Sequence, residues 1–244
     1  MTQNGTMSTL SWQNRVKGLA NNFINFVFPP RCVNCHAVGS LLCLECRAQI
    51  EWLTEPLCPQ CGRTLDEPQL LCRVCRKRPL PLTQIRAATL FTEPIPKMIH
   101  NFKYNGQFGL SVPLVEVMVE AWSLWKTAVD VVIPIPLHPQ RKKARGYNQS
   151  ALLAKRFGKQ LSLHVREESL CRVKNTPPQV NLNAIDRQNN MYQAFIVKDD
   201  MIDGQNILLI DDVCTTGATM ASAAEALLAA GAKSVAGYCV ARAM

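Results

Sequence analysis

The sequence predicts an α/β protein with a parallel β-sheet, preceded by a small cysteine-rich module. The short apolar run at 207–210 is typical of a strand buried on both faces of a parallel sheet. The Ala-, Met- and Leu-rich segment at 220–230 that follows favours a helix. A second strongly apolar strand is predicted at 129–135. The third observation is a series of four Cys-x-x-Cys pairs near the N-terminus, which indicates a metal-binding module.

Length and charge narrow the class of protein. The chain has 244 residues, enough for one α/β domain of usual size and a small appendage. Its formal net charge of +9 favours polyanionic partners such as phosphorylated small molecules or nucleic acid. It lacks an uncharged apolar run of about 18 residues, so we expect no membrane span. The N-terminus lacks the pattern of a signal peptide, which predicts a cytoplasmic protein.

The segment 1–28 is predicted to form a tail and a short amphipathic helix. Residues 10–28 carry apolar side chains at roughly helical spacing, until Pro29 ends the pattern. The polar face of this helix holds only two cations, Arg15 and Lys17. We therefore expect it to pack on the rest of the protein rather than on a membrane surface.

The cysteine-rich module is expected at 29–79. Its paired cysteines are Cys32, Cys35, Cys43, Cys46, Cys58, Cys61, Cys72 and Cys75. In a reducing cytoplasm such pairs favour metal ligands over disulfides. Each Cys-x-x-Cys turn offers two thiolates, and two turns complete a closed tetrahedral site, so two structural Zn²⁺ ions are predicted. Pairing in sequence order is the simplest arrangement, and an interleaved arrangement stays open.

The α/β domain is expected at 80–244, after a basic and proline-rich linker. The expected elements are a strand at 85–91, helices at 96–105 and 110–126, a strand at 129–135, a helix at 148–162, and strands at 194–197, 207–210 and 234–240. The polar segment 171–193 shows no clear periodicity. A long loop of this kind suits a hood over a ligand site.

A run of cations follows the strand at 129–135 directly. It consists of Arg141, Lys142, Lys143 and Arg145. An α/β protein would place anion-neutralising groups at this position, after a core strand. The plain alternative is a solvated basic loop, which charge runs usually are.

An acidic pair and a hydroxyl-rich loop follow the strand at 207–210. Asp211 and Asp212 are strong acceptors for two vicinal sugar hydroxyls. The loop residues after them are Thr215, Thr216, Gly217, Ala218 and Thr219. Their backbone N–H groups and hydroxyls can surround a phosphate at the start of a helix, where the helix dipole favours negative charge. The combination suits a ribose 5-phosphate at the carboxyl edge of the sheet, whereas an isolated Asp-Asp pair would suit an ordinary strand–loop–helix junction.

This run resembles the phosphoribosyl-pyrophosphate (PRPP) binding motif of the type I phosphoribosyltransferases. Together with several other stretches, this run makes the chain resemble the ComF/GntX (ComFC-like) family from about residue 26 onward. The matching stretches are Phe28-Pro-Pro-Arg-Cys32, Ile99-His-Asn-Phe-Lys-Tyr-Asn-Gly106, Pro134-Ile-Pro136 and Asp211-Asp-Val-Cys-Thr-Thr-Gly217. They also include Arg141 with Arg145-Gly-Tyr-Asn-Gln149, and the spaced residues Arg172, Thr176, Gln179, Arg187 and Ala194-Phe195. The resemblance implies a type I phosphoribosyltransferase-like (Rossmann-like) parallel sheet with a small N-terminal double zinc ribbon.

The same resemblance implies roles for single residues. Asp211 and Asp212 would hold the ribose hydroxyls of PRPP, and the loop from Thr215 to Thr219 its 5-phosphate. Arg141 and Arg145 would face pyrophosphate, helped by Lys103. Mg²⁺ would bridge pyrophosphate and ribose, since it usually binds through substrate oxygens.

Two function classes stay open. The resemblance implies a competence protein that handles incoming single-stranded DNA in natural transformation, with a competence helicase or DNA-processing protein as partner. The alternative is an active phosphoribosyltransferase in nucleotide or base salvage with no role on DNA. A PRPP-sensing regulator is a third class, but the sequence has no helix-turn-helix pattern. The sequence decides neither catalysis nor the acceptor.

Overall fold

The computed structural model describes residues 29–68, 70–125, 127–174, 194–198 and 201–243. The helix expected at 10–28 lies outside these residues. The chain divides into two compact units, Met1–Ala48 and Gln49–Met244. The division falls between the two groups of cysteines, within the predicted module at 29–79. The boundaries expected after residues 28 and 79 stay predictions.

The described part of the first unit is organised around its cysteines. Cys32 and Cys46 are its most buried residues, and apolar side chains such as Val38 are exposed. One short helix, α2 (Leu44–Arg47), contains most of the second Cys-x-x-Cys turn, with Cys43 as its N-cap. So little apolar burial is typical of small domains that fold around a metal ion.

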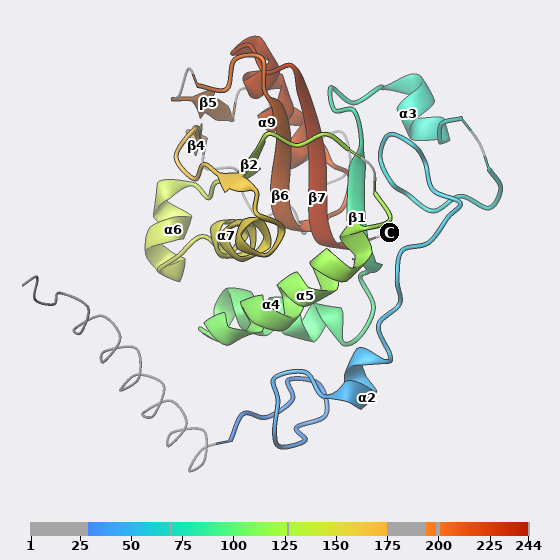
Figure 1. The fold of residues 1–244 in the computed structure, drawn as a ribbon, viewed down its shortest axis with the longest axis vertical. Coiled ribbons are helices and arrows are strands. Elements are labelled where there is room, and N and C mark those ends of the chain that lie inside the picture. The colour runs from blue at the N-terminus through green and yellow to red at the C-terminus, as the bar shows by residue number, and fades with distance from the viewer. Residues whose placement is uncertain (1–28, 69, 126, 175–193, 199–200, 244) are drawn as a thin grey trace, which may run out of the picture. The chain divides into compact units, whose positions relative to one another are not determined.

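The second unit contains a parallel sheet with the strand order β1-β7-β6-β2-β3 (Figure 1). Its strands are β1 (Ile85–Leu90), β2 (Val131–Pro134), β3 (His164–Val165), β6 (Asn206–Cys214) and β7 (Ser234–Arg242). All four neighbouring pairs run parallel, which confirms the predicted α/β class. From β2 the chain moves outward to β3, and from β6 it moves the other way to β7. The topological switch point therefore lies at the carboxyl ends of the neighbouring strands β2 and β6, where such sheets bind ligands.

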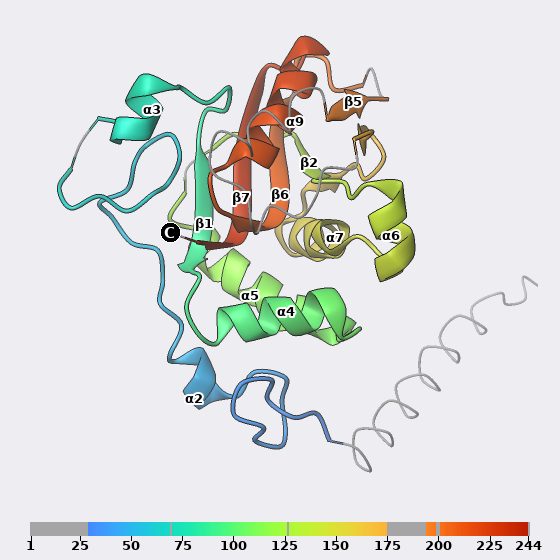
Figure 2. The ribbon, with the colours of Figure 1, turned by 180° about the vertical axis from the view of Figure 1, so that it is seen from behind.

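Helices cover both faces of the sheet. They are α4 (Ile95–Tyr104), α5 (Ser111–Trp122), α7 (Gln149–Leu161) and α9 (Ala218–Ala229), with a 3-10 turn, η1 (Phe108–Leu110), between the first two. On one face, Trp122 of α5 and Phe157 of α7 pack on Tyr238 of β7. On the other face, α9 packs on β7 within the main apolar cluster, and Figure 2 shows it beside β7.

One segment differs from the expected loop, and a second is described only at its ends. The cation run forms a helix, α6 (Pro139–Arg145), because Pro139 suits the first turn and the His138 side chain accepts a hydrogen bond from the N–H of Gln140. Gly146, at φ +83°, ends this helix. Of the predicted hood, 175–193 lie outside the described residues, and β4 (Leu170–Arg172) pairs antiparallel with β5 (Phe195–Val197).

Within the described residues, every helix is too short or too polar to traverse a lipid bilayer.

Candidate functional site

Strand β6 continues past its neighbour β2. Its pairing with β2 ends where Pro134 faces Ile210, and one further bond joins the Ile135 N–H to the Ile210 carbonyl. Its pairing with β7 continues as far as Cys214. The expected strand at 207–210 was therefore too short, because a single apolar run does not reveal how far a neighbouring strand extends. The acidic pair lies within β6, on the part that β2 leaves uncovered.

Each member of the acidic pair has a fixed set of partners. The Ser150 hydroxyl, at the start of α7, donates to Asp211 Oδ1 at 2.8 Å. The Asp212 N–H donates to the same oxygen at 2.9 Å. On the other carboxylate, Lys103 Nζ lies 2.5 Å from Asp212 Oδ2. Lys103 comes from α4, so three separate elements meet at the pair.

Burial and mutual repulsion set the protonation of the pair. Burial raises the pKa of Asp211 to about 7, and the neighbouring charge of Asp212 acts in the same direction. The positive charge of Lys103 and the Ser150 hydroxyl oppose this rise in pKa. Burial alone would lower the pKa of Lys103, but attraction to Asp212 raises it overall, so this side chain stays cationic. Asp211 can therefore exchange a proton near neutral pH beside the ion pair of Lys103 and Asp212.

A cavity of about 280 Å³ opens beside the pair. Its volume is near the lower end of the roughly 300–1,000 Å³ of small-molecule sites. It is lined by Phe91, Lys103, Asp211, Asp212, Val213, Cys214, Thr215, Gly217, Ala218, Thr219, Met220 and Ala243. One cavity thus contains the acidic pair, Lys103 and four of the five predicted loop residues. Thr216 does not line it; its hydroxyl accepts a hydrogen bond from the Ala218 N–H at 3.3 Å.

Gly217 gives the loop its shape. It has φ +81° and precedes the first residue of α9, Ala218. A Cβ on Gly217 would lie 2.8 Å from Cδ1 of Ile85, so a larger residue would be strained at this φ and would require the Ile85 side chain to move. The first turn of α9 contains no acidic residue, which leaves the positive end of the helix dipole available to an anion.

Arg141 and Arg145, the cations predicted to face pyrophosphate, lie outside the lining of this cavity. Arg145 Nη1 donates to Gln149 Oε1 at 2.6 Å, and its guanidinium lies 5.1 Å from the ring centroid of Tyr104. In the described part of the chain, neither Arg141 nor Arg145 lines the cavity.

Two residues near the pair were not among the predicted site residues. One is Ser150, whose partner Asp211 lies 61 positions away, so no local pattern marks it. The other is Arg172 of β4. Burial lowers the pKa of Arg172, and the charge of Arg141 adds to this, whereas Asp211 opposes it. Arg172 therefore lies within electrostatic range of both Arg141 and Asp211.

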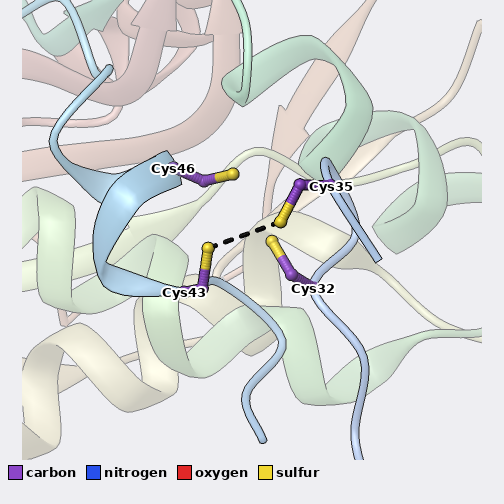
Figure 3. A group of neighbouring side chains, drawn as sticks. All are labelled: Cys32, Cys35, Cys43 and Cys46. Atoms are coloured by element: carbon purple, nitrogen blue, oxygen red, sulfur yellow. Dashed lines mark hydrogen bonds between the residues drawn. The ribbon is translucent and has the colours of Figure 1, made fainter. Parts of the chain in front are cut away.

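The cysteines form two groups in sequence order. In Figure 3 the side chains of Cys32, Cys35, Cys43 and Cys46 point toward a common centre. The second group consists of Cys58, Cys61, Cys72 and Cys75, and in each group the sulfur atoms lie within 4.8 Å of one another. Sequence-order pairing is therefore confirmed, and the interleaved arrangement is excluded. Four convergent thiols with no further donor fit a closed structural zinc site.

The second group is the more buried, and backbone N–H groups favour the ionised form of one of its thiols, Cys58. All four of its cysteines are buried, whereas Cys35 of the first group is exposed. Burial would raise the pKa of Cys58, but backbone N–H groups of Cys72, Cys61 and Gln60 outweigh it and lower that pKa to about 6. The Cys72 N–H lies 3.4 Å from Cys58 Sγ. Such N–H donors orient thiolates toward a bound cation.

Comparisons with known proteins match both parts of the chain. Residues 23–81 match the model of the Double zinc ribbon domain, and residues 151–244 match that of the Phosphoribosyl transferase domain. DNA utilization protein YhgH of Salmonella typhi is 31% identical over 191 residues, covering 76% of this chain and 84% of that protein. Competence protein F of Haemophilus influenzae is 30% identical over 233 residues, covering 91% and 99%.

More distant similarities complete the comparison. Competence protein ComFC of Bacillus subtilis is 29% identical over 203 residues, covering 78% of this chain and 79% of that protein. Among solved structures, adenine phosphoribosyltransferase from Thermoanaerobacter pseudethanolicus aligns with a TM-score of 0.35 and 12% identity, covering 57% of this chain and 82% of that one.

Proposed function

The chain belongs to the ComF family of competence proteins, and from that premise we propose that it acts in the cytoplasm on incoming DNA during natural transformation. Its two proposed ligands are a phosphoribosyl compound such as PRPP and single-stranded DNA. One observation carries the first ligand: the acidic pair and the loop before α9 line the same cavity.

In the proposed complex each part of PRPP has its own partners. The backbone from Thr215 to Thr219 surrounds the 5-phosphate at the start of α9. Asp211 and Asp212 accept hydrogen bonds from the ribose hydroxyls. Lys103 lines the same cavity and is the nearest cation for pyrophosphate, with Arg141 and Arg145 on α6 as outer cations. Asp211 and Asp212 lie where they would support a Mg²⁺ ion brought in by PRPP, and that ion would supply positive charge toward pyrophosphate.

A second candidate function is phosphoribosyl transfer in nucleotide or base salvage, without any role on DNA. The observation that favours it is Asp211, whose pKa of about 7 allows proton exchange inside the cavity. In that reaction the bond from ribose C1 to pyrophosphate breaks while C1 bonds to the acceptor. The cations of the site stabilise the departing pyrophosphate.

The proposed DNA contact is the basic surface around α3 (Arg73–Lys77). A surface recess there is lined by Arg73, Val74, Arg76, Lys77 and Arg78. Val74 is exposed, so an apolar spot lies among four cations. Such a surface suits the phosphate backbone of a nucleic acid. A helicase or DNA-processing protein is the proposed protein partner.

Calorimetry with PRPP and Mg²⁺, and separately with single-stranded DNA, tests both ligands. We expect the intact chain to bind each, and Asp211→Ala/Asp212→Ala to lose PRPP binding but keep DNA binding. Affinity for DNA should fall steeply as salt rises, and Arg76→Met/Lys77→Met should reduce the salt slope by roughly two. The matched control is Lys159→Met, an exposed cation on α7.

Each proposed ligand can fail separately. PRPP affinity that is equal in the intact chain and the double alanine variant would contradict the proposed pocket. DNA binding that is absent or insensitive to salt would remove the DNA role and leave salvage as the function. Pyrophosphate release with candidate bases then tests transfer.

A further inference from the structure

The second cysteine group is attached to the sheet by close backbone contacts. The Ile85 N–H, at the start of β1, donates to the Gln60 carbonyl at 2.6 Å. The Gln60 side-chain amide donates to the Leu80 carbonyl at 3.0 Å. At Gly62 an added Cβ would lie 2.4 Å from the Ile85 carbonyl oxygen. The two backbone segments are therefore in contact at a position where only glycine fits. This group is therefore a fixed part of the larger unit.

Two buried arginines lie on the strands beside this group. Arg86 of β1 is 9% exposed and Arg242 of β7 is 2% exposed. Arg86 Nη1 donates to the carbonyls of Pro59 and Ile85, both at 2.9 Å, and its guanidinium lies 5.3 Å from the ring centroid of Trp125. Arg242 Nη1 donates to Cys214 Sγ at 3.3 Å. The Pro59 contact lies directly next to the first cysteine of the group, Cys58.

These arginines lack a conventional counter-charge. Among the described residues, neither forms an ion pair with a carboxylate, and the Nε atom of each is buried without a hydrogen-bond partner. Glu55 attracts Arg86 only at longer range, and the two guanidinium groups repel each other. Two buried cations in this position need a nearby anion.

The cysteine group can supply that anion. A Zn²⁺ ion held by four thiolates carries two net negative charges, which equal the two guanidinium charges. Burying such a centre is costly unless cations compensate it. The thiolates of Cys58 and Cys61 attract Arg86, and Arg242 attracts Cys61. Charge and position are therefore complementary.

Arg242 connects the second cysteine group to the candidate ligand site. Its partner Cys214 lines the cavity, and Cys214 Sγ lies 3.9 Å from the Cβ position at Gly217. Ile85, which carries the backbone contact to Gln60, packs against the same glycine. Both routes lead from the second cysteine group to the loop before α9.

We propose that the second metal centre is the counter-charge of Arg86 and Arg242, and that Arg242 positions the loop before α9 through Cys214. The ligand of that loop rests on the proposed function, but the link between metal centre and loop does not. Arg242 is a positioning residue in this proposal. The first cysteine group, in the other compact unit, has no such role.

Metal retention tests the charge relation. Arg242→Met should weaken zinc binding at one of the two sites by roughly 10- to 100-fold, measured as zinc released to a chelator, and Arg242→Lys should restore most of it. Arg31→Met is the matched control, because it removes an exposed arginine next to Cys32 of the first group. Zinc retention in Arg242→Met equal to that of the intact chain would overturn the proposal.

Hydrogen exchange of the backbone amides at 214–219 tests the link to the loop. Cys61→Ser/Cys75→Ser and Arg242→Met should both raise this exchange, whereas Cys35→Ser/Cys43→Ser should leave it at the level of the intact chain. Equal exchange in all variants contradicts the link, and if the Cys61→Ser/Cys75→Ser chain does not fold, Arg242→Met against Arg242→Lys decides. A chain that binds no PRPP yet gives the expected zinc and exchange results rejects only the proposed ligand.

Discussion

Asp211 and Asp212 were predictable as a pair, but their partners were not. The run from 207 to 219 indicates two carboxylates before a phosphate loop. Nothing in the sequence indicates that Lys103 pairs with Asp212 or that Ser150 donates to Asp211. Both contacts join elements that are far apart in sequence, and only the packing of α4 and α7 against β6 brings them together. The sequence therefore predicts the chemistry of a site better than its charge balance.

The raised pKa of Asp211 predicts a pH-dependent stability. Its pKa is about 7 in the folded chain and about 3.9 in an unfolded one, so the folded state binds the proton more tightly. Stability should therefore fall as pH rises from about 4 to 7. Asp211→Asn keeps the acceptor for Ser150 and removes this loss, so it should be more stable at pH 8 by roughly 2–4 kcal/mol.

Chemical denaturation of both chains at pH 8 and pH 4 measures this difference. The gain should shrink to about 0.5 kcal/mol at pH 4, where the carboxyl is protonated in the folded chain and about half protonated in the unfolded one. Ser150 still donates to the variant, so a lost hydrogen bond does not obscure the result. A constant difference between the two pH values would mean that the folded chain does not raise this pKa.

At the scale of elements, the positions of strands were predictable from the local pattern of apolar residues. The length of a strand was not predictable where it depends on pairing with a neighbouring strand. The strands at 85–91, 129–135 and 234–240 are confirmed as β1, β2 and β7 to within a few residues. The extent of β6 was underestimated, because it is set by pairing with β7. The cation run was expected as a loop, but the proline and histidine at its start make it a helix. Charge marks exposure without revealing backbone conformation.

The turn into α9 predicts a specific effect of one methyl group. Gly217→Ala should reduce PRPP affinity by at least about tenfold. The added Cβ meets Ile85, and alanine disfavours the left-handed backbone conformation of residue 217, so the loop should change shape. Gly204→Ala is the matched control, since Gly204 has φ +67° and nothing within 4 Å of an added Cβ. Its cost should be limited to about 1–2 kcal/mol of stability. Calorimetry with PRPP and thermal unfolding of both variants measure the two effects, and equal PRPP affinities would contradict the proposed loop.

At the scale of the whole molecule, the sequence predicts two modules, and the structure relates them differently. Spacing alone indicates both cysteine groups, and the structure confirms their pairing. The second group shares a compact unit with the sheet, and a backbone hydrogen bond joins Ile85 of β1 to Gln60. Contacts of this kind carry no mark in composition or periodicity. They explain why a module that is separate in sequence can support a site elsewhere in the fold.

The most direct test of the account is a crystal structure of the intact chain with ribose 5-phosphate. The account predicts that the phosphate lies against the backbone N–H groups of 215–219, with two ribose hydroxyls on Asp211 and Asp212. A ligand bound elsewhere, or one whose phosphate faces α6 while the loop before α9 stays empty, would contradict it.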